Sequence, residues 1–229
     1  MFPALERLGV SWEAVVVDDG SVDKTAAAAA ALAAARSNIF VVSLRPGRGL
    51  GGALRAGFSA ARGEWIATLD ADLTFRPEAL KDMLDAARAC GAELVAGSPY
   101  LRSGDLEAVP WARTLPSLMM NALYRGLFGM RLTAYTPILR LYRAARLREL
   151  PLSCEGFEIN AEIAARGLLD GWRVAEVPAA LGTRSVGASK LGRGKELARH
   201  LSLIARLLGP WEKPSAASGG LLGLARKEK

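Results

Sequence analysis

The stretch Trp65-Ile66-Ala67-Thr68-Leu69-Asp70-Ala71-Asp72 decides the fold class of this chain. An apolar run of strand character stops on two aspartates that stand one residue apart. Residues i and i+2 of an extended chain point the same way, so both carboxylates can reach one cation at the end of the strand. Magnesium or manganese held by one or two carboxylates keeps other positions for water and phosphate oxygens. The stretch therefore predicts an enzyme that acts on a diphosphate, with a turn-forming role for the aspartates as the alternative.

A second acidic pair, Asp18 and Asp19, follows the short β-rich run at 14–17. A carboxylate at the end of such a strand commonly accepts hydrogen bonds from a ribose or a base. The alternative is a helix cap, for which Ser21 or Asp23 would serve equally well.

Glycines 47, 49, 51 and 52 surround Arg48 and resemble a phosphate-binding loop. The match to a dinucleotide fingerprint is weak, because no Gly-x-Gly-x-x-Gly leads directly out of a strand. These glycines more simply allow a close approach of the backbone at a helix start.

The rest of the chain alternates strand and helix, which predicts an α/β fold with a mostly parallel sheet flanked by helices. Ligands in such sheets bind at the carboxyl ends of the strands, where both acidic pairs stand. The expected strands are 14–17, 39–44, 65–70, 93–96 and 173–177, and the expected helices are 24–36, 53–61, 77–87, 113–127, 158–165 and 194–208. The expected inward faces are Leu80, Met83, Leu84 and Ala87 on one helix and Ile159 and Ile163 on another. On the last helix, an apolar stripe is formed by Leu197, Leu201, Ile204 and Leu208.

The positive charge of the chain is concentrated at its C-terminal end. The net charge is +7, and residues 184–229 carry ten basic and three acidic side chains, so the remaining 183 residues are neutral. Such a distribution indicates an anionic surface or a phosphate-bearing ligand near this end, with a solvated tail as the alternative. Apolar runs fall short of the ~18 residues that a membrane-spanning helix needs.

The remaining reactive residue types restrict the chemistry. Cys90 and Cys154 stand alone and are expected to be reduced. His200, the only histidine, is expected to be an ordinary surface residue on the basic late helix. With no histidine near a serine or cysteine to activate a nucleophile, the chemistry must rest on cationic stabilisation of a leaving phosphate.

Several motifs together resemble family 2 glycosyltransferases of the GT-A fold. These are residues 15–21 (VVVDDGS), residues 47–57 and the segment Asp70-Ala71-Asp72. Residues 154–158 (CEGFE), 175–178 (AEVP) and 184–191 (RSVGASKL) resemble the dolichol-phosphate mannosyltransferase branch in particular.

The resemblance implies inverting transfer of a hexose, most simply mannose, from a nucleotide sugar such as GDP-mannose or a UDP-hexose to a polyprenyl phosphate. The metal, Mg²⁺ or Mn²⁺, is expected on Asp70 and Asp72. The expected catalytic residues are Asp72, Arg113, Arg184 and Lys190, and the expected donor-binding residues are Asp18, Asp19, Arg48, Asp70, Ala71 and Arg140.

The resemblance also organises the chain. It implies a glycosyltransferase domain over residues 1–191 whose first strand is missing, a basic amphipathic helix over 192–208, and a flexible tail over 209–229. Lys195, Arg199 and Arg206 would meet anionic lipid while the apolar face of this helix lies among the headgroups, and packing of that face against the sheet is the alternative. The protein would then be cytoplasmic and peripheral at the inner membrane face. A membrane-anchoring protein is a candidate partner, and nucleic acid is not an expected partner.

Three segments differ from the family pattern. Pro99 stands where the family tends to place arginine, residues 136–140 (TPILR) replace a Thr-Ser-Gly-Phe-Arg-like segment, and Thr74 occupies the place of a polar group that is often glutamine. Two other readings remain: a catalytically impaired relative that binds nucleotide sugar or partners without turnover, and a nucleotidyltransferase.

Overall fold

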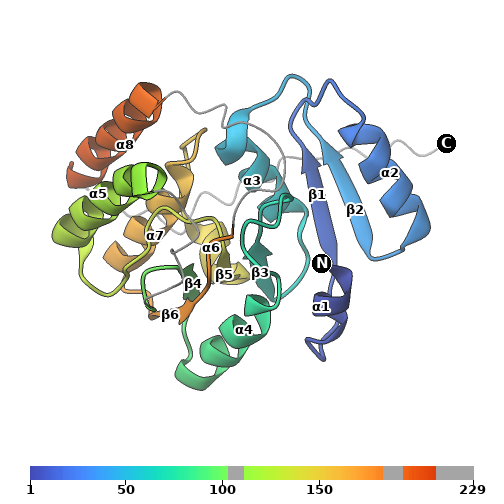
Figure 1. Ribbon diagram of the computed structural model, residues 1–229, viewed down its shortest axis with the longest axis horizontal. Helices are drawn as coiled ribbons and strands as arrows, with labels where there is room; N and C mark the ends of the chain where they lie inside the picture. Colours follow the sequence, from blue (N-terminus) through green and yellow to red (C-terminus); the bar gives the residue numbers. More distant parts are fainter. Residues whose placement is uncertain (103–110, 183–192, 210–229) are drawn as a thin grey trace.

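The computed structural model describes residues 1–102, 111–182 and 193–209, and it forms an α/β fold (Figure 1). The elements in chain order are α1 (Phe2–Glu6), β1 (Ala14–Asp18), α2 (Thr25–Ala35), β2 (Ile39–Ser43), α3 (Gly49–Ala60), β3 (Trp65–Thr68), α4 (Ala79–Cys90), β4 (Leu94–Ser98), α5 (Trp111–Phe128), β5 (Arg140–Arg143), α6 (Ala144–Glu149), α7 (Ile159–Leu169), β6 (Val174–Pro178) and α8 (Arg193–Leu208).

The strands form two sheets rather than one. Strands β1 and β2 pair in parallel, with Ala14 opposite Ile39 and Asp18 opposite Ser43. The second sheet has the order β3-β5-β4-β6, in which β4 and β6 are parallel. Strand β5 runs antiparallel to both of its neighbours. Strands β3, β4 and β6 therefore all run in one direction, as a mostly parallel sheet predicts, and β5, which the sequence pattern did not predict, lies antiparallel in their middle.

The division of the sheet falls between β1 and β3. Within the described residues, β1 pairs with β2 alone and β3 pairs with β5 alone, so one edge of each strand has no strand partner. Helix α3 connects the two parts. A Cβ on Gly57 would lie 3.3 Å from Val17 of β1, while Leu54 packs against the core of the larger sheet. Arg62, just after α3, also binds Glu13 at the start of β1.

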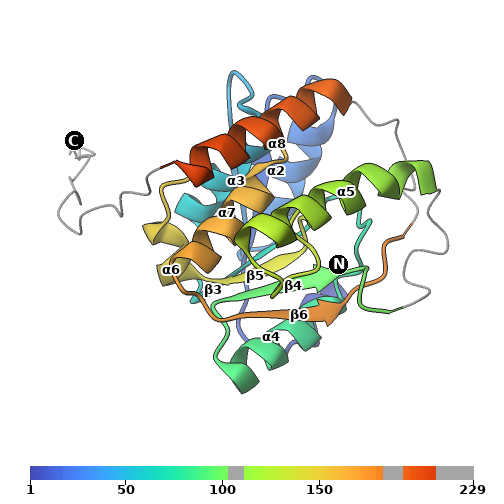
Figure 2. The ribbon, with the colours of Figure 1, turned by 90° about the vertical axis from the view of Figure 1, so that its left-hand side faces the viewer.

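The larger sheet is covered on both faces. Figure 2 shows α5, α7 and α8 together on one side and α4 on the other. The buried stripe predicted for α4 is confirmed, since Leu80, Met83, Leu84 and Ala87 are all buried. Ile159 and Ile163 of α7 are fully buried, also as predicted. These helices exclude water from both faces of the sheet, and burial of this apolar area is the main stabilising contribution.

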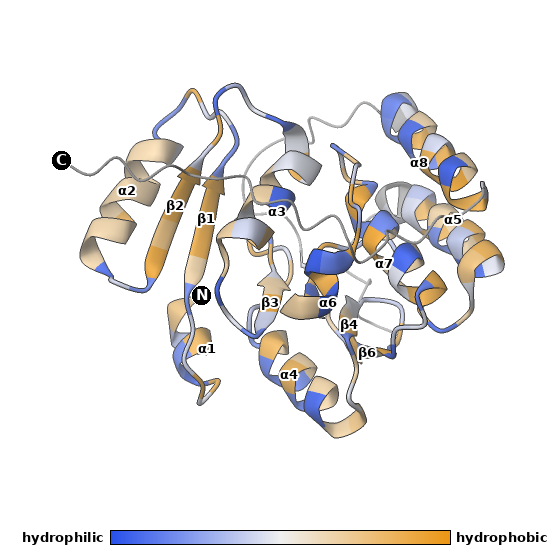
Figure 3. Ribbon diagram, turned by 180° about the vertical axis from the view of Figure 1, so that it is seen from behind, coloured by the Kyte–Doolittle hydropathy of each residue, from blue (hydrophilic) through white to orange (hydrophobic). Residues whose placement is uncertain are grey.

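Helix α8 packs against the core through one face and leaves most of its predicted apolar stripe exposed. Leu203, Ile204 and Leu207 are buried against the core, whereas Leu197, Leu201 and Leu208 are exposed. Figure 3 shows hydrophilic and hydrophobic residues interleaved along this helix. Of the two arrangements left open for the stripe, packing against the core therefore applies to Ile204 alone, because both sets of positions recur at helical spacing and tertiary packing selects between them.

The structure corrects the expectation that His200 of α8 lies at the surface. The side chain is buried, and its Nδ1 lies 3.0 Å from the hydroxyl of Tyr124 on α5. Burial lowers its pKa, although the charge of Glu158 opposes that shift. Both cysteines are free, as expected. In the described part of the chain, the apolar helices are too short or too polar to cross a membrane.

Candidate functional site

The carboxylate of Asp18 ends β1 in a buried position. It accepts hydrogen bonds from the backbone N–H of Ser21 at 3.0 Å and from Nη2 of Arg45 at 2.8 Å. The contacts with Ser21, and then the Arg45 guanidinium, hold its pKa below the usual range. Asp18 is therefore a fixed anion that shapes this end of the strand.

Asp19 holds the loop that follows β2. Its Oδ1 accepts the backbone N–H of Arg48 at 2.6 Å, and the N–H of Leu44 bonds to the carbonyl oxygen of Asp18 at 2.9 Å. A Cβ on Gly47 would lie 2.5 Å from the carbonyl oxygen of Asp19, which explains a glycine there. The structure thus brings together three predicted donor-binding residues, Asp18, Asp19 and Arg48.

The second acidic pair lies in the turn after β3. Asp70, Ala71 and Asp72 precede Leu73, whose φ of +52° is left-handed and strained for a residue with a side chain. Oδ1 of Asp72 accepts the backbone N–H of Thr74 at 3.0 Å and its hydroxyl at 2.7 Å. Thr74 therefore orients one carboxylate of the predicted metal pair.

The residues after this turn meet a segment that is distant in the sequence. The N–H of Gly182 bonds to the carbonyl oxygen of Thr74 at 2.9 Å, and Phe75 forms an antiparallel bridge with Leu181. Gly182, the last described residue before Arg184 and Lys190, therefore lies beside the residues that follow the Asp70–Asp72 turn. Arg184 and Lys190 themselves, and the side chain of Arg113, lie outside the described residues.

Arg140 lies inside the molecule rather than at its surface. Its guanidinium is fully buried and donates from Nε to the carbonyl oxygen of Pro137 at 3.1 Å and from Nη2 to that of Ala134 at 2.8 Å. Burial lowers its pKa. In this structure Arg140 supports the 134–137 segment, and its contact with a phosphate stays a prediction.

Two further side chains hold that segment. Glu176 of β6 accepts the N–H groups of Thr133 and Ala134 at 2.8 and 3.0 Å. Asn121 of α5 accepts the N–H of Tyr135 at 2.8 Å. Residues 133–135, which lead into the segment 136–140 that differs from the family pattern, are therefore held by contacts from both the sheet and a covering helix.

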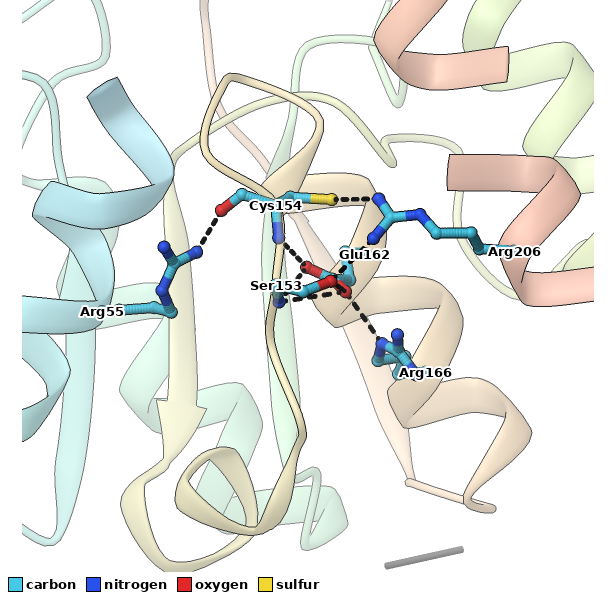
Figure 4. Close-up of polar contacts among 6 residues, drawn as sticks. All are labelled: Arg55, Ser153, Cys154, Glu162, Arg166 and Arg206. Carbon is cyan, nitrogen blue, oxygen red and sulfur yellow. Dashed lines mark hydrogen bonds and ion pairs between the residues drawn. The ribbon is translucent and has the colours of Figure 1, made fainter. Parts of the chain in front are cut away.

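A third cluster, missed by the sequence patterns, surrounds Glu162 of α7 (Figure 4). The buried carboxylate accepts the N–H groups of Ser153 and Cys154 and pairs with Arg166. Burial first, and then Glu162, raises the pKa of the Cys154 thiol to about 12, so it stays protonated and is not a nucleophile. The available signal was the position of Glu162 among Ile159 and Ile163, on the buried face of the helix.

The Asp70–Asp72 pair fits a divalent cation by its chemistry. Among the described residues, groups of three or more acidic, histidine or cysteine side chains suited to a metal are absent. Magnesium sites commonly use one or two carboxylates and complete their coordination with water and substrate phosphates. Two half-buried carboxylates at a strand end match that pattern.

Comparison with known proteins identifies a family. The family model described as "Glycosyl transferase family 2" matches residues 4–150. Polyprenol monophosphomannose synthase of Mycolicibacterium smegmatis is 36% identical over 184 residues, which cover 77% of this chain and 69% of the relative. Undecaprenyl-phosphate mannosyltransferase of Micrococcus luteus is 34% identical over 80% of this chain and 76% of its own. Dolichol-phosphate mannosyltransferase of Pyrococcus furiosus is 32% identical over 89% of this chain but 57% of its own.

A solved structure agrees in fold. Glucosyl-3-phosphoglycerate synthase of Mycobacterium tuberculosis, solved with Mn²⁺, uridine diphosphate and phosphoglyceric acid, superposes with a TM-score of 0.59 at 23% identity. The alignment covers 90% of this chain and 71% of that one. At this identity the likeness concerns the fold alone.

Proposed function

The chain belongs to glycosyl transferase family 2, and from that membership we propose that it transfers a hexose, most simply mannose, from a nucleotide sugar to a polyprenyl phosphate. The observation that carries the proposal is the similarity, over 77%, 80% and 89% of this chain, to three relatives named as polyprenyl-phosphate mannosyltransferases. The alternative of an impaired relative would keep the same fold and donor contacts without turnover.

The donor would lie across the two acidic strand ends. Asp18 and Asp19 would contact the nucleoside, and Arg48 and Ala71 would lie along the nucleotide. Asp70 and Asp72 would hold Mg²⁺ or Mn²⁺, which, when bound, neutralises charge on the diphosphate. The support from the structure is that hydrogen bonds already fix the carboxylates of Asp18, Asp19 and Asp72.

The chemical step needs no protein base. An oxygen of the acceptor phosphate, already ionised at neutral pH, attacks the anomeric carbon in line as the bond from that carbon to the nucleoside diphosphate breaks. Inversion follows from the single displacement. Arg113, Arg184 and Lys190 would stabilise the phosphates on either side of the sugar by charge-assisted hydrogen bonds.

The acceptor is a lipid, so the protein must work at a membrane surface. Leu197, Leu201 and Leu208 of α8 are exposed, and so is Lys195 on the same helix. The guanidinium of Arg206 instead donates to Ser153, and Arg199 pairs with Glu196, so the expected contact of these two arginines with lipid is not seen in this structure. On neighbouring α5, the exposed apolar side chains include Leu115, Leu118, Met119, Leu123 and Leu127. We infer that this outward face lies among the headgroups at the cytoplasmic membrane face, where each basic contact contributes about 1 kcal/mol. Binding would be reversible and sensitive to salt, and a membrane-anchoring partner protein could strengthen it.

The test is turnover by the purified protein, supplemented with membranes, on GDP- and UDP-sugars with short polyprenyl phosphates. We expect a glycosylated lipid phosphate and free nucleoside diphosphate in the presence of Mg²⁺ or Mn²⁺. Nucleotide binding without product would favour the impaired relative instead. Appearance of nucleotide, rather than sugar, on the acceptor would favour a nucleotidyltransferase.

A further inference from the structure

Glu162 is a buried carboxylate that the proposed reaction does not use. Its side chain is fully buried in α7, between the core and the segment that precedes this helix. Its oxygens accept the N–H of Ser153 at 3.1 Å, the N–H of Cys154 at 2.9 Å and the hydroxyl of Ser153 at 3.2 Å. Nε of Arg166 adds an ion pair at 3.0 Å.

Because every one of these contacts is internal, Glu162 is not placed to touch a substrate. Burial alone would raise its pKa, but the hydrogen bonds from the backbone of Cys154 and Ser153 outweigh burial and lower it. The residue is therefore a permanent anion, and a buried anion is tolerated only where its hydrogen bonds are satisfied. Moving the Ser153–Cys154 backbone would break those bonds, so Glu162 fixes this backbone in place.

The fixed segment contacts helix α3, and Figure 4 shows the contact between Arg55 and Cys154. Arg55 of α3 donates to the carbonyl oxygen of Cys154, and the N–H of Gly51 donates to that of Glu155 at 2.7 Å. A Cβ on Gly51 would overlap the carbonyl oxygen of Cys154, and one on Gly49 would lie 2.5 Å from that of Glu155. These glycines are thus required by contact with the segment.

From the α8 side, Arg206 reinforces the same segment. Its Nη1 donates to the hydroxyl of Ser153 at 2.8 Å, and its Nη2 lies 3.2 Å from the sulfur of Cys154. The segment is consequently held by α3, α7 and α8 at once.

The loop between β2 and the start of α3 contacts the end of β1. Arg48 is the residue before α3, and its N–H is bound by Asp19. Arg45 of the same loop pairs with Asp18. A shift of the first turn of α3 would therefore displace both carboxylates that are proposed to bind the nucleoside.

We propose that Glu162 is a positioning residue for the donor: through the Ser153–Glu155 segment it fixes the glycine-rich start of α3, and with it the loop that holds Asp18 and Asp19. This rests on the proposed function for the identity of the donor, and it adds a residue far from the reacting atoms to the donor site. Loss of the anion should weaken nucleotide binding more than it changes the binding of the lipid acceptor.

The test compares Glu162→Gln with Glu93→Gln. Glu93 stands before β4 and, like Glu162, accepts a backbone N–H and pairs with an arginine, but it contacts Arg173 and Arg146 and not the segment. Two measurements are made well below the unfolding temperature: the affinity for UDP and GDP with Mn²⁺, and amide hydrogen exchange over residues 45–52. We expect Glu162→Gln to raise the nucleotide Kd at least tenfold and to speed that exchange, while Glu93→Gln leaves both within twofold of wild type.

Gly51→Ala provides an independent perturbation from the α3 side. It should produce the same two effects. The nucleotide Kd of the double variant should equal the larger of the two single-variant Kd values, because both changes disrupt one contact. Additive losses would overturn the proposal, as would wild-type nucleotide affinity or wild-type exchange over 45–52 in Glu162→Gln.

The outcomes separate this proposal from the proposed function. If the wild-type protein binds neither nucleotide, the proposed function fails, and the exchange rates alone then decide whether Glu162 holds the start of α3. If Glu162→Gln is too unstable to purify, Ser153→Ala removes one hydroxyl from the same carboxylate and should show both effects in weaker form.

Discussion

Acidification to pH 5.5 should destabilise this protein through His200, and replacement with glutamine should remove the effect. His200 is buried between α8 and α5 beside the hydroxyl of Tyr124, and burial lowers its pKa while the charge of Glu158 partly offsets the shift. An unfolded histidine takes up a proton below about pH 6.5. Between that pH and the lower native pKa, the unfolded chain therefore binds more protons than the native protein, and stability falls as the pH falls.

The size of the effect follows from the same linkage. If the native protein keeps His200 neutral at pH 5.5, protonation stabilises the unfolded chain by RT ln 11, about 1.4 kcal/mol, against about 0.1 kcal/mol at pH 7.5. The difference is an upper limit, because Glu158 returns part of the proton affinity to the native state. For a chain of this length, 1 kcal/mol corresponds to about 2–4 °C in Tm.

The assay is urea unfolding at pH 7.5, 6.5 and 5.5 for the wild type and His200→Gln, in which the amide can still accept from the Tyr124 hydroxyl. Because the chain has a single histidine, every other titrating group is common to both proteins. We expect the free energy of unfolding of the wild type to fall relative to the variant by up to about 1.4 kcal/mol. Parallel pH profiles, or a wild type that gains stability in acid, would refute the reasoning.

Three further outcomes are expected. Asp72→Asn should abolish metal-dependent nucleotide binding, measured by calorimetry, while the circular dichroism spectrum stays that of the wild type; unchanged affinity would remove the metal assignment. Arg184→Ala should reduce turnover far more than Tm, and a parallel loss of both would mark the residue as structural. Gly167→Ala would place a Cβ 2.7 Å from the ring of buried Trp172, so overpacking should cost about 1–3 kcal/mol in urea unfolding, and a neutral result would mean that the ring can move.

Local pattern was sufficient for most helices and strands but not for the arrangement of the sheet. Strands β1 to β4 and β6 stand out as apolar runs, each close to its observed bounds. Strand β5 is four residues long and begins and ends with arginine, so its sequence carries little strand signal. Its place is fixed by pairing with β3 and β4, which are more than 40 residues away in the chain.

At the candidate site too, features that depend on local sequence were predictable and features that depend on tertiary packing were not. The acidic strand ends were predictable because their chemistry is local: two carboxylates, one residue apart, after an apolar strand. Glu162 and His200 were not, since a polar residue on an amphipathic helix is ordinarily expected on its solvent face, and both of these side chains are buried. Whether such a position faces solvent or the core depends on which helical face packs. The Tyr124 hydroxyl that meets His200 is distant in sequence, and the Ser153–Cys154 backbone that meets Glu162 belongs to the irregular segment before α7.

The divided sheet has a consequence for work with the purified protein. Strand β1 is alanine, three valines and an aspartate, with no proline or lysine to discourage pairing along the edge that has no strand partner among the described residues. An open, apolar strand edge is a template on which further chains can add by backbone hydrogen bonding. Self-association is thus expected to begin at β1 and to grow with protein concentration, so dilute samples, or a short peptide that caps this edge, should keep the protein monodisperse.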